Sequence, residues 1–409
     1  MEFRKYDPTK DKDAVHRIWH ETGWLTKGKE EAMDLLVESG RASVADVNEE
    51  AECLVTTHPG TIRYLNEDLP FSCVSAVTTS RIARKQGFAS RLTAEAVAID
   101  AAEGALVSGL GMFEQGYYNQ LGFGTGGYEH RISFDPSSLN IHSKPRVPRR
   151  ITPEDWKIVH ASRMNRFRGH GFCNLNPPEF TRANMMGTDN GFGLGYCDGP
   201  NGELTHHFWC EAKAVEPGPY HVAWMSFQNR EEFLELMALI KNLGDQVRLV
   251  RMREPQGIQI QDILLKPFKQ YTLTEKSKFE SRMEAYAYWQ MRICDLKGCL
   301  EKTHLHGDGI HFNLKLTDPI EKYLEKKNPW HGIPGDYVVT LGSSSGAEKG
   351  RNSKLSTLNA SVGAFTRMWL GVRPASGLAV TDELSGPPEL LEGLDRILRL
   401  PDPKPDWDF

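Results

Sequence analysis

The amino-acid sequence predicts an α+β protein built from three successive regions. Its 409 residues suit two to three domains, each large enough to bury a core of its own. Helix-like and strand-like patterns alternate through residues 1–135 and begin again after a connector rich in proline and serine. A third group of strand and helix patterns follows from residue 285.

The first region opens with two helix patterns, at residues 7–23 and 30–40. Short runs rich in apolar and β-branched residues follow and predict strands, at residues 42–47, 52–58, 61–65 and 71–79. After a further helix, residues 105–113 predict a short buried strand. Residues 117–135 then predict a short helix, a glycine-rich turn and a strand.

The connector DPSSLNIHSKPRVPRR separates the first region from the second. The second region repeats the helix–strand alternation and includes an amphipathic helix at residues 230–244. The third region has strand patterns, and helix patterns at residues 356–371 and 387–398. We therefore expect three domains, at residues 1–135, 151–284 and 285–409.

The composition is that of an ordinary globular protein, with 39% hydrophobic and 25% charged residues. A net charge of −5 argues against non-specific nucleic-acid binding and is compatible with a cationic substrate. No run of 18 apolar residues predicts a membrane span, and the charged start lacks a signal core, so we expect a cytoplasmic protein. Seven cysteines, none in a Cys-x-x-Cys pair, are too few for a disulfide scaffold.

The stretch VTTSRIARKQGFASRLTAEAVAID, residues 77–100, places Gly87 where a helix begins. Glycine in a helix costs about 1 kcal/mol relative to alanine. The residues that enter this helix, Ile82, Ala83 and Arg84, offer no side chain that caps its free N–H groups. We therefore expect either a solvated basic first turn or a bound anion, which the neighbouring positive charges and a close approach at Gly87 would favour.

Two segments of this region together resemble the GCN5-related N-acetyltransferase (GNAT) family. The first, RKQGFA, matches the family's Arg/Gln-x-x-Gly-x-Gly/Ala loop, which holds the pyrophosphate of acetyl-CoA, at Arg84, Gly87 and Ala89. Gln86 departs from the run of arginines that is common at this point. With the preceding strand, which in the family pairs with the pantetheine arm, the resemblance implies these coenzyme-binding residues: Val77, Thr79, Arg84, Lys85, Gln86, Gly87, Phe88 and Ala89.

The second segment, YYNQLGF at residues 117–123, matches the family's Tyr-x-x-x-Gly-Phe pattern. In the family this tyrosine lies beside the coenzyme sulfur, so the resemblance implies that Tyr118 is the general acid. A phenol with a pKa near 10 stays protonated at neutral pH and can donate to a leaving thiolate. The alternative for Tyr118 is a packing role with a structural hydrogen bond, and we expect Tyr117 to pack.

The whole chain is similar to the enhanced intracellular survival (Eis) branch of the family. That branch has an active GNAT domain, a second GNAT-like domain without the loop, and a sterol-carrier-protein-like domain. The resemblance implies the fold class in full: two GNAT-like mixed-sheet domains followed by a sterol-carrier-protein-like α/β domain. It also implies a homo-oligomer, often a hexamer, and a chain end whose carboxylate, here that of Phe409, is the base in the active site.

The last residues, LPDPKPDWDF, contain three prolines that stiffen the tail. A terminal carboxylate is a weak base, with a reference pKa of about 3.3–3.7, which desolvation in a closed cleft would raise. Asp408 is expected to attract a cationic amine, the alternative being a solvated charge. Trp24 belongs to the segment that lines the acceptor cleft in this family, the alternative being a core position.

We expect an acetyl-CoA-dependent N-acetyltransferase that acts by direct transfer on small-molecule primary amines, of aminoglycoside or polyamine type. Protein lysines are an alternative acceptor, and a non-catalytic acyl-CoA- or lipid-binding protein is an alternative of another class. No metal is expected, because the histidine-rich residues 304–311, HLHGDGIH, fall where a polar loop is predicted. Neither a nucleic acid nor a membrane is an expected partner.

Overall fold

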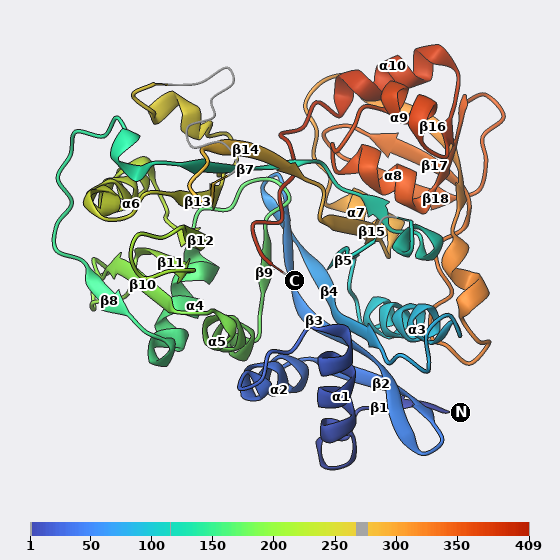
Figure 1. Ribbon diagram of the computed structural model, residues 1–409. Helices are drawn as coiled ribbons and strands as arrows, with labels where there is room; N and C mark the ends of the chain where they lie inside the picture. Colours follow the sequence, from blue (N-terminus) through green and yellow to red (C-terminus); the bar gives the residue numbers. More distant parts are fainter. Residues whose placement is uncertain (1, 115, 267–276, 409) are drawn as a thin grey trace.

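The computed structural model describes residues 2–114, 116–266 and 277–408, and three β-sheets organise it (Figure 1). In the order of their hydrogen-bonded neighbours, the strands of the first sheet are β1 (Glu2–Lys5), β2 (Arg41–Val47), β3 (Glu50–Tyr64), β4 (Glu67–Thr79), β5 (Val107–Gly111), β15 (Trp289–Ile293) and β6 (Gly124–Thr125), with β9 (Cys173–Leu175) paired to β3. Its helices are α1 (Pro8–Thr22), α2 (Glu30–Glu38), α3 (Phe88–Ala102) and the 3-10 helix η1 (Tyr118–Leu121).

The second sheet is mixed and belongs mainly to the second region. Its strands, in spatial order, are β14 (Arg282–Tyr286), β7 (Glu129–Phe134), β13 (Val250–Arg253), β12 (Tyr220–Ser226), β11 (His206–Ala212), β10 (Gly191–Tyr196) and β8 (Arg149–Ile151). The helices of this region are α4 (Trp156–Asn165), α5 (Pro178–Gly187) and α6 (Arg230–Asn242).

The third sheet lies near the end of the chain. Its strands are β18 (Gly346–Lys349), β17 (Gly335–Leu341), β16 (Ile310–Thr317), β19 (Thr357–Ser361) and β20 (Leu384–Ser385). Its helices are α7 (Leu296–Glu301), α8 (Val362–Trp369), α9 (Ala375–Thr381) and α10 (Pro388–Ile397). The predicted class, two mixed-sheet units followed by an α/β unit, is confirmed.

Three strands pair across the domain boundaries that the sequence predicts. β7 lies before residue 135 but pairs with β13 and β14 in the second sheet. β9 belongs to the second region but pairs with β3, and β15 belongs to the third region but pairs with β5 and β6. The division into residues 1–135, 151–284 and 285–409 therefore does not coincide with the division into sheets.

The candidate functional site lies in a gap that opens where β4 and β5 stop pairing. The parallel pairing of these strands runs from Phe71 with Val107 to Val74 with Leu110 and stops there. On the other side of β4, the register with β3 shifts next to Ala76, whose φ of 51° is left-handed. A β-bulge of this kind bends a strand and re-aims its side chains. The remainder of β4 therefore diverges from β5 and leaves one backbone edge without a described partner strand.

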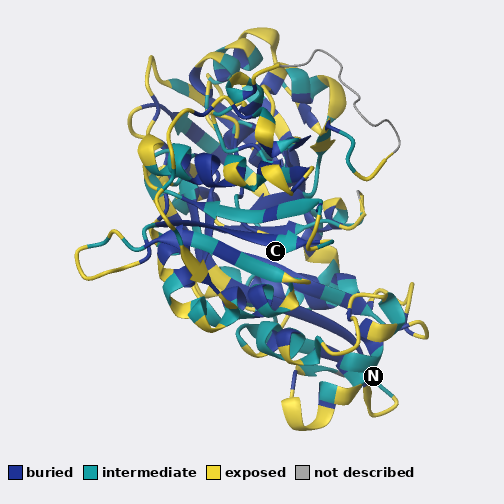
Figure 2. Cartoon of the chain, turned by 60° about the vertical axis from the view of Figure 1, so that its left-hand side comes forward, coloured by how far each residue is buried: buried dark blue, intermediate teal, exposed yellow. Residues whose placement is uncertain are grey.

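Burial follows the sheets, as Figure 2 shows: buried residues gather on the strands, and exposed ones lie on loops and on the outer sides of helices. One apolar cluster joins the first sheet to the third unit, where Tyr64 stacks on Trp369 with ring centroids 4.4 Å apart. The Tyr64 hydroxyl also donates to the Trp369 carbonyl oxygen at 3.0 Å. None of the described helices combines the length and apolarity required to cross a bilayer.

Candidate functional site

A cavity of about 770 Å³, here called the main cavity, lies where β4 and β5 diverge. Its size is typical of sites for drug-sized ligands. The structure brings together these predicted site residues along its wall: Trp24, Val77, Thr79, Arg84, Lys85, Gly87, Phe88, Ala89, Tyr118 and Asp408. Gln86 is exposed in the same loop but does not line the cavity, and Phe409 lies outside the described residues.

The start of helix α3 faces this cavity without a side-chain cap. Gly87 is the N-cap residue, with a left-handed φ of 80°, and no side chain bonds to the first turn. Within the described residues, the amide N–H groups of Phe88 and Ala89 have no acceptor. A Cβ atom added to Gly87 would meet nothing within 4 Å, so space for a ligand lies directly against the backbone. Free N–H groups, the helix dipole and two nearby basic side chains together form an environment that suits an anion.

Tyr118 presents its phenol to the same cavity. The residue is 7% exposed, and its hydroxyl has no hydrogen-bond partner among the described residues. Burial, with a smaller contribution from the neighbouring Tyr117, raises the pKa of Tyr118 above its usual value. Tyr117 differs, because its hydroxyl accepts a hydrogen bond from Ser90 Oγ at 3.0 Å. Tyr118 is thus the phenol of the pair that is free to donate its proton to a ligand.

Gly122 and Phe123 fix the turn that carries Tyr118. Gly122 ends η1 with a left-handed φ of 82°, and an added Cβ would lie 2.6 Å from Val362 Cγ1. Phe123 is 1% exposed, and its amide donates to the Tyr118 carbonyl oxygen at 3.2 Å. The Arg292 guanidinium donates to the Leu121 carbonyl oxygen at the end of the turn. The Gly-Phe pair read from the sequence therefore packs the tyrosine turn against the third unit.

The tail of the chain reaches the main cavity at Asp408. Asp408 lines it from a position next to Arg253, with which its carboxylate forms an ion pair. A side cavity of about 360 Å³ shares Trp24, Asn184 and Asp408 with the main cavity. Trp24 is 46% exposed and lines both cavities, so it is not a core residue.

The part of the chain that carries both sequence motifs matches a known protein family. Residues 3–126 match the family model of the acetyltransferase (GNAT) domain. This segment is a GNAT acetyltransferase domain. The match includes β4, the Gly87 loop and Tyr118, and it confirms the family and the enzyme class that the two sequence motifs predicted.

Solved structures share the fold of the whole chain around this GNAT domain. A probable N-acyltransferase from Enterococcus faecalis has a TM-score of 0.80 at 16% identity, over 100% of this chain and 99% of its own. A GCN5-related N-acetyltransferase from Anabaena variabilis has a TM-score of 0.78 at 13% identity, over 100% of both chains. Eis1 from Mycobacterium abscessus has a TM-score of 0.75 at 13% identity, also over 100% of both chains. No curated protein matches the sequence.

Residues outside the motifs complete the main cavity of the GNAT domain. Phe113 and Glu114 follow β5, and Phe180 and Asn184 come from α5 of the second region. Phe113 is 89% exposed and offers an apolar ring at the edge of the cavity. The sequence carries no signal for the two α5 residues, because only the packing of α5 beside α2 brings them to the GNAT domain.

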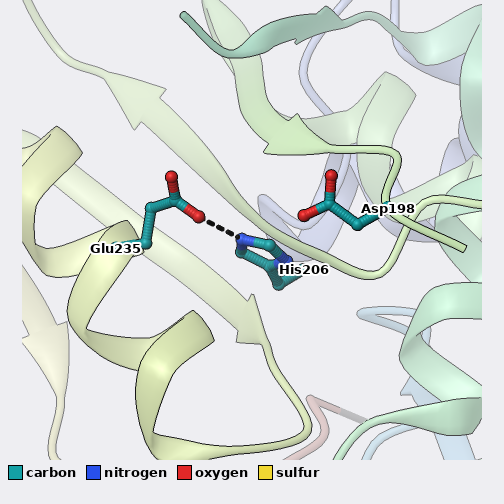
Figure 3. A group of neighbouring side chains, drawn as sticks. All are labelled: Asp198, His206 and Glu235. Atoms are coloured by element: carbon teal, nitrogen blue, oxygen red, sulfur yellow. Dashed lines mark hydrogen bonds and ion pairs between the residues drawn. The ribbon is translucent and has the colours of Figure 1, made fainter. Parts of the chain in front are cut away.

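A second cluster of ligand-type side chains lies away from the GNAT domain (Figure 3). Asp198, His206 and Glu235 place ligand atoms within 4.8 Å of one another, and His206 Nε2 is 3.1 Å from Glu235 Oε2. The guanidinium of Arg146 contacts Asp198 at 2.7 Å and Glu235 at 2.8 Å. This arginine lowers the pKa of Glu235 to about 2. The cluster thus already contains a cation and forms an ion-pair network.

Proposed function

We propose that this chain transfers an acetyl group from acetyl-CoA to a primary amine, by direct transfer within the main cavity. One observation carries the proposal. The start of α3 at Gly87 and the phenol of Tyr118 face the same cavity, and neither is bonded to a side chain of the described residues. The first is suited to a diphosphate, and the second to a leaving thiolate.

The proposed coenzyme contacts follow the wall of the cavity. The N–H groups at the start of α3, with Arg84 and Lys85 in the preceding loop, bind the diphosphate. The free backbone edge of β4 at Val77 and Thr79 supports the pantetheine arm and donates to the thioester oxygen. Gly87, Phe88 and Ala89 keep the helix start accessible. The fit rests on the open space at Gly87 and on the volume of the cavity.

Tyr118 is the proposed general acid. Its raised pKa keeps the phenol protonated at neutral pH. As the amine nitrogen forms a bond to the acetyl carbon, the carbon–sulfur bond breaks, and Tyr118 gives its proton to the departing sulfur. The nitrogen of the new amide releases its surplus proton, which restores the phenol of Tyr118. Donors of this kind contribute about 10²–10⁴ in rate.

The proposed base belongs to the tail. Attack requires a neutral amine, so an ammonium must first lose a proton to a carboxylate in the cavity. We assign this role to the carboxylate of Phe409, as the resemblance to the Eis branch implies, because its neighbour Asp408 lines both cavities. The carboxylate of Asp408 would attract the cationic amine before transfer.

The side cavity is the proposed acceptor site. The aromatic side chain of Trp24 lines it together with Asp408, and aromatic faces and carboxylates both attract organic cations. Aminoglycoside-like compounds and polyamines are therefore the proposed substrates, and a homo-oligomer of this chain is the proposed assembly. A protein-lysine acetyltransferase or a non-catalytic acyl-CoA- or lipid-binding protein are the alternatives.

A thiol-release assay with acetyl-CoA tests the proposal over a panel of aminoglycosides, polyamines and lysine peptides. The Tyr118→Phe variant should lower kcat at least 100-fold with an unchanged KM for acetyl-CoA. Its melting temperature should stay that of the wild type, because the lost hydroxyl has no partner among the described residues. Removal of Phe409 should also lower kcat sharply.

Tyr337→Phe is the matched control, because it removes a tyrosine hydroxyl that donates to Ile333 in the third unit, far from the cavity. Its kcat should stay within twofold of the wild type. Turnover of peptides in preference to small amines would favour the lysine acetyltransferase. Binding of acetyl-CoA without turnover of any amine would favour the non-catalytic protein.

A further inference from the structure

Residues 401–408, here called the tail, leave the third unit and run between the first and second sheets (Figure 1). Their backbone is held in place, because Cys173 N donates to the Pro405 carbonyl oxygen at 2.7 Å and Lys404 N donates to the His170 carbonyl oxygen at 3.2 Å. The tail ends in the main cavity at Asp408. Chain ends usually fray, so a tail held over its whole length indicates a specific receptor.

That receptor contains three arginines of the second region, here called the arginine clamp: Arg163, Arg166 and Arg253. Arg166 is 7% exposed and holds Asp406 by two contacts. Its Nε donates to Asp406 Oδ2 at 2.7 Å, and its Nη2 donates to the Asp406 carbonyl oxygen at 3.1 Å. Paired hydrogen bonds from one guanidinium fix direction as well as distance. Arg166 thus fixes the position of the tail at Asp406, the residue that precedes Trp407.

Trp407 fills a slot beside Arg163. The tryptophan is 1% exposed, and the guanidinium carbon of Arg163 lies 3.7 Å from its ring centroid. The same guanidinium lies 4.3 Å from the ring centroid of Trp224, so it contacts two indoles. Among the described residues Arg163 forms no ion pair with a carboxylate, and the one hydrogen bond of its side chain there is to Thr181 Oγ1, at 3.5 Å. A buried cation in this position is stabilised by the aromatic faces, of which Trp407 supplies one.

Arg253 holds the last described residue of the tail. Its guanidinium forms the ion pair with Asp408 and donates to the Tyr288 hydroxyl at 3.2 Å. Arg253 is the last residue of β13 and pairs in register with Arg131 of β7, so the second sheet fixes its backbone. The three arginines therefore contact three consecutive residues of the tail, with alternating charge and aromatic contacts.

We propose that the second region, which lacks the coenzyme loop, serves as the receptor of the tail, and that the arginine clamp positions the carboxylate end of the tail for acetyl transfer. This inference rests on the proposed function, in which a tail carboxylate accepts the proton of the amine. Misplacement of a reacting group by about 1 Å can lower a rate about 100-fold. Arg166 and Arg253 are accordingly positioning residues that act through the tail.

Full-length Arg166→Gln and Arg253→Gln test the inference by two readouts. Hydrogen exchange of the tail amides, measured by mass spectrometry, should become at least tenfold faster in both variants. The kcat for the best amine should fall at least tenfold, while the KM for acetyl-CoA stays within twofold, because the coenzyme residues lie elsewhere. Arg253→Lys should recover part of kcat, because it restores the charge beside Asp408.

Asp406→Asn tests the same contact by changing the residue of the tail, and it is used if Arg166→Gln fails to fold. The double variant Arg166→Gln/Asp406→Asn should lose no more kcat than Arg166→Gln alone, because Arg166→Gln already removes the ion pair that Asp406→Asn weakens. Arg149→Gln is the control, because Arg149 pairs with Asp155 on the surface of the same region. Both of its readouts should stay within twofold of the wild type.

Two results would overturn the inference. Tail exchange at the wild-type rate in both arginine variants would show that the clamp does not hold the tail. Faster exchange with unchanged kcat would show that the position of the tail is irrelevant to transfer. Failure of the proposed function looks different, because the wild type would then turn over no amine while tail exchange would still report whether the clamp holds.

Discussion

Gly87 combines two requirements in one residue. Its left-handed φ of 80° is open to glycine without strain, and its missing side chain leaves the start of α3 exposed to the main cavity. Other residues adopt this conformation at a cost of about 1–2 kcal/mol. Gly104, near the opposite end of α3, allows the effect of the backbone conformation to be measured by itself. It also has a positive φ, of 106°, and open space around it.

Gly87→Ala and Gly104→Ala should therefore destabilise the protein to a similar extent, by about 1–2 kcal/mol. Only Gly87→Ala should weaken acetyl-CoA binding. The loss of one hydrogen bond to a charged group is worth about 1.5–3 kcal/mol, which corresponds to about a 10- to 100-fold rise in KM. Urea unfolding and steady-state kinetics measure the two effects. An equal KM in both variants would contradict the anion site.

At this scale the sequence predicts well whatever lies within one local motif. Arg84, Gly87 and Tyr118 belong to two short patterns, and the structure brings them to one cavity. Phe180 and Asn184 could not be predicted in the same way. Their place in the cavity depends on how α5 packs on α2, and no local spacing encodes that contact.

Among the elements, η1 depends most clearly on a distant part of the chain. Arg292 of β15 donates to the end of η1 and pairs with Asp318 at 2.6 Å, and both side chains of this pair have no solvent exposure. Asp318 also accepts from the amides of Ile320 and Ile333. The turn that carries Tyr118 is therefore supported by a buried charge pair of the third unit.

Asp318→Asn should destabilise the protein by about 3–5 kcal/mol, because it leaves the charge of Arg292 buried without a partner. The exposed pair of Lys297 with Glu301 provides the control. Glu301→Gln should cost at most about 0.5 kcal/mol. Urea unfolding of both variants measures the difference. A loss below about 1 kcal/mol for Asp318→Asn would contradict the importance of the buried pair.

Elements are predicted less completely than motifs. Residues 71–79 are expected as one strand, and β4 does cover them. The bulge could not be predicted, because position 76 has a left-handed φ but is an alanine and not a glycine. Residues 356–371 are expected as helix, whereas Thr357–Ser361 form strand β19 before α8 begins. The short strand alternates buried and exposed residues, and its parallel partner β16 determines its conformation.

At the scale of the whole molecule, His170 of the second region connects the first unit to the third. Its Nδ1 accepts from the amide of Leu65 in the first unit at 3.1 Å, and its Nε2 donates to the carbonyl oxygen of Leu370 in the third unit at 2.9 Å. This pattern requires a neutral ring. Burial lowers the pKa of His170 to about 4, an effect that the bond to Leu370 partly offsets.

Acidification should therefore destabilise the protein between pH 6.5 and pH 4. In this window the unfolded chain, with a histidine pKa of about 6.5, binds a proton that the folded chain excludes. For His170 alone the loss from pH 7 to pH 5 is about 2 kcal/mol. His170→Gln should be less stable at pH 7 and should lose about 2 kcal/mol less over this range.

Urea unfolding at pH 7 and pH 5 measures this slope. His331→Gln, at an exposed position, is the control and should keep the wild-type slope. A His170→Gln slope equal to that of the wild type would mean that the ring is not held neutral at the junction. Other buried histidines, such as His58, have a lowered pKa for the same reason and add to the wild-type slope.

At this largest scale the order of elements could be predicted, but their assignment to sheets could not. Helix and strand patterns are local, whereas the choice of a partner strand depends on which apolar faces meet after folding. β7 lies in a stretch that the sequence predicts as a strand of the first region, yet it pairs in the second sheet. β9 and β15 pair with strands of the first sheet, across predicted boundaries.

The place of β15 between β5 and β6 has a consequence for biosynthesis. A nascent chain that has emerged only as far as residue 126 contains every motif of the GNAT domain but lacks the strand that joins β5 to β6. Until residues 289–293 leave the ribosome, the facing edges of β5 and β6 stay open to wrong partners. The enzyme is thus completed late in translation, and a fragment ending at residue 126 should be recovered as aggregate.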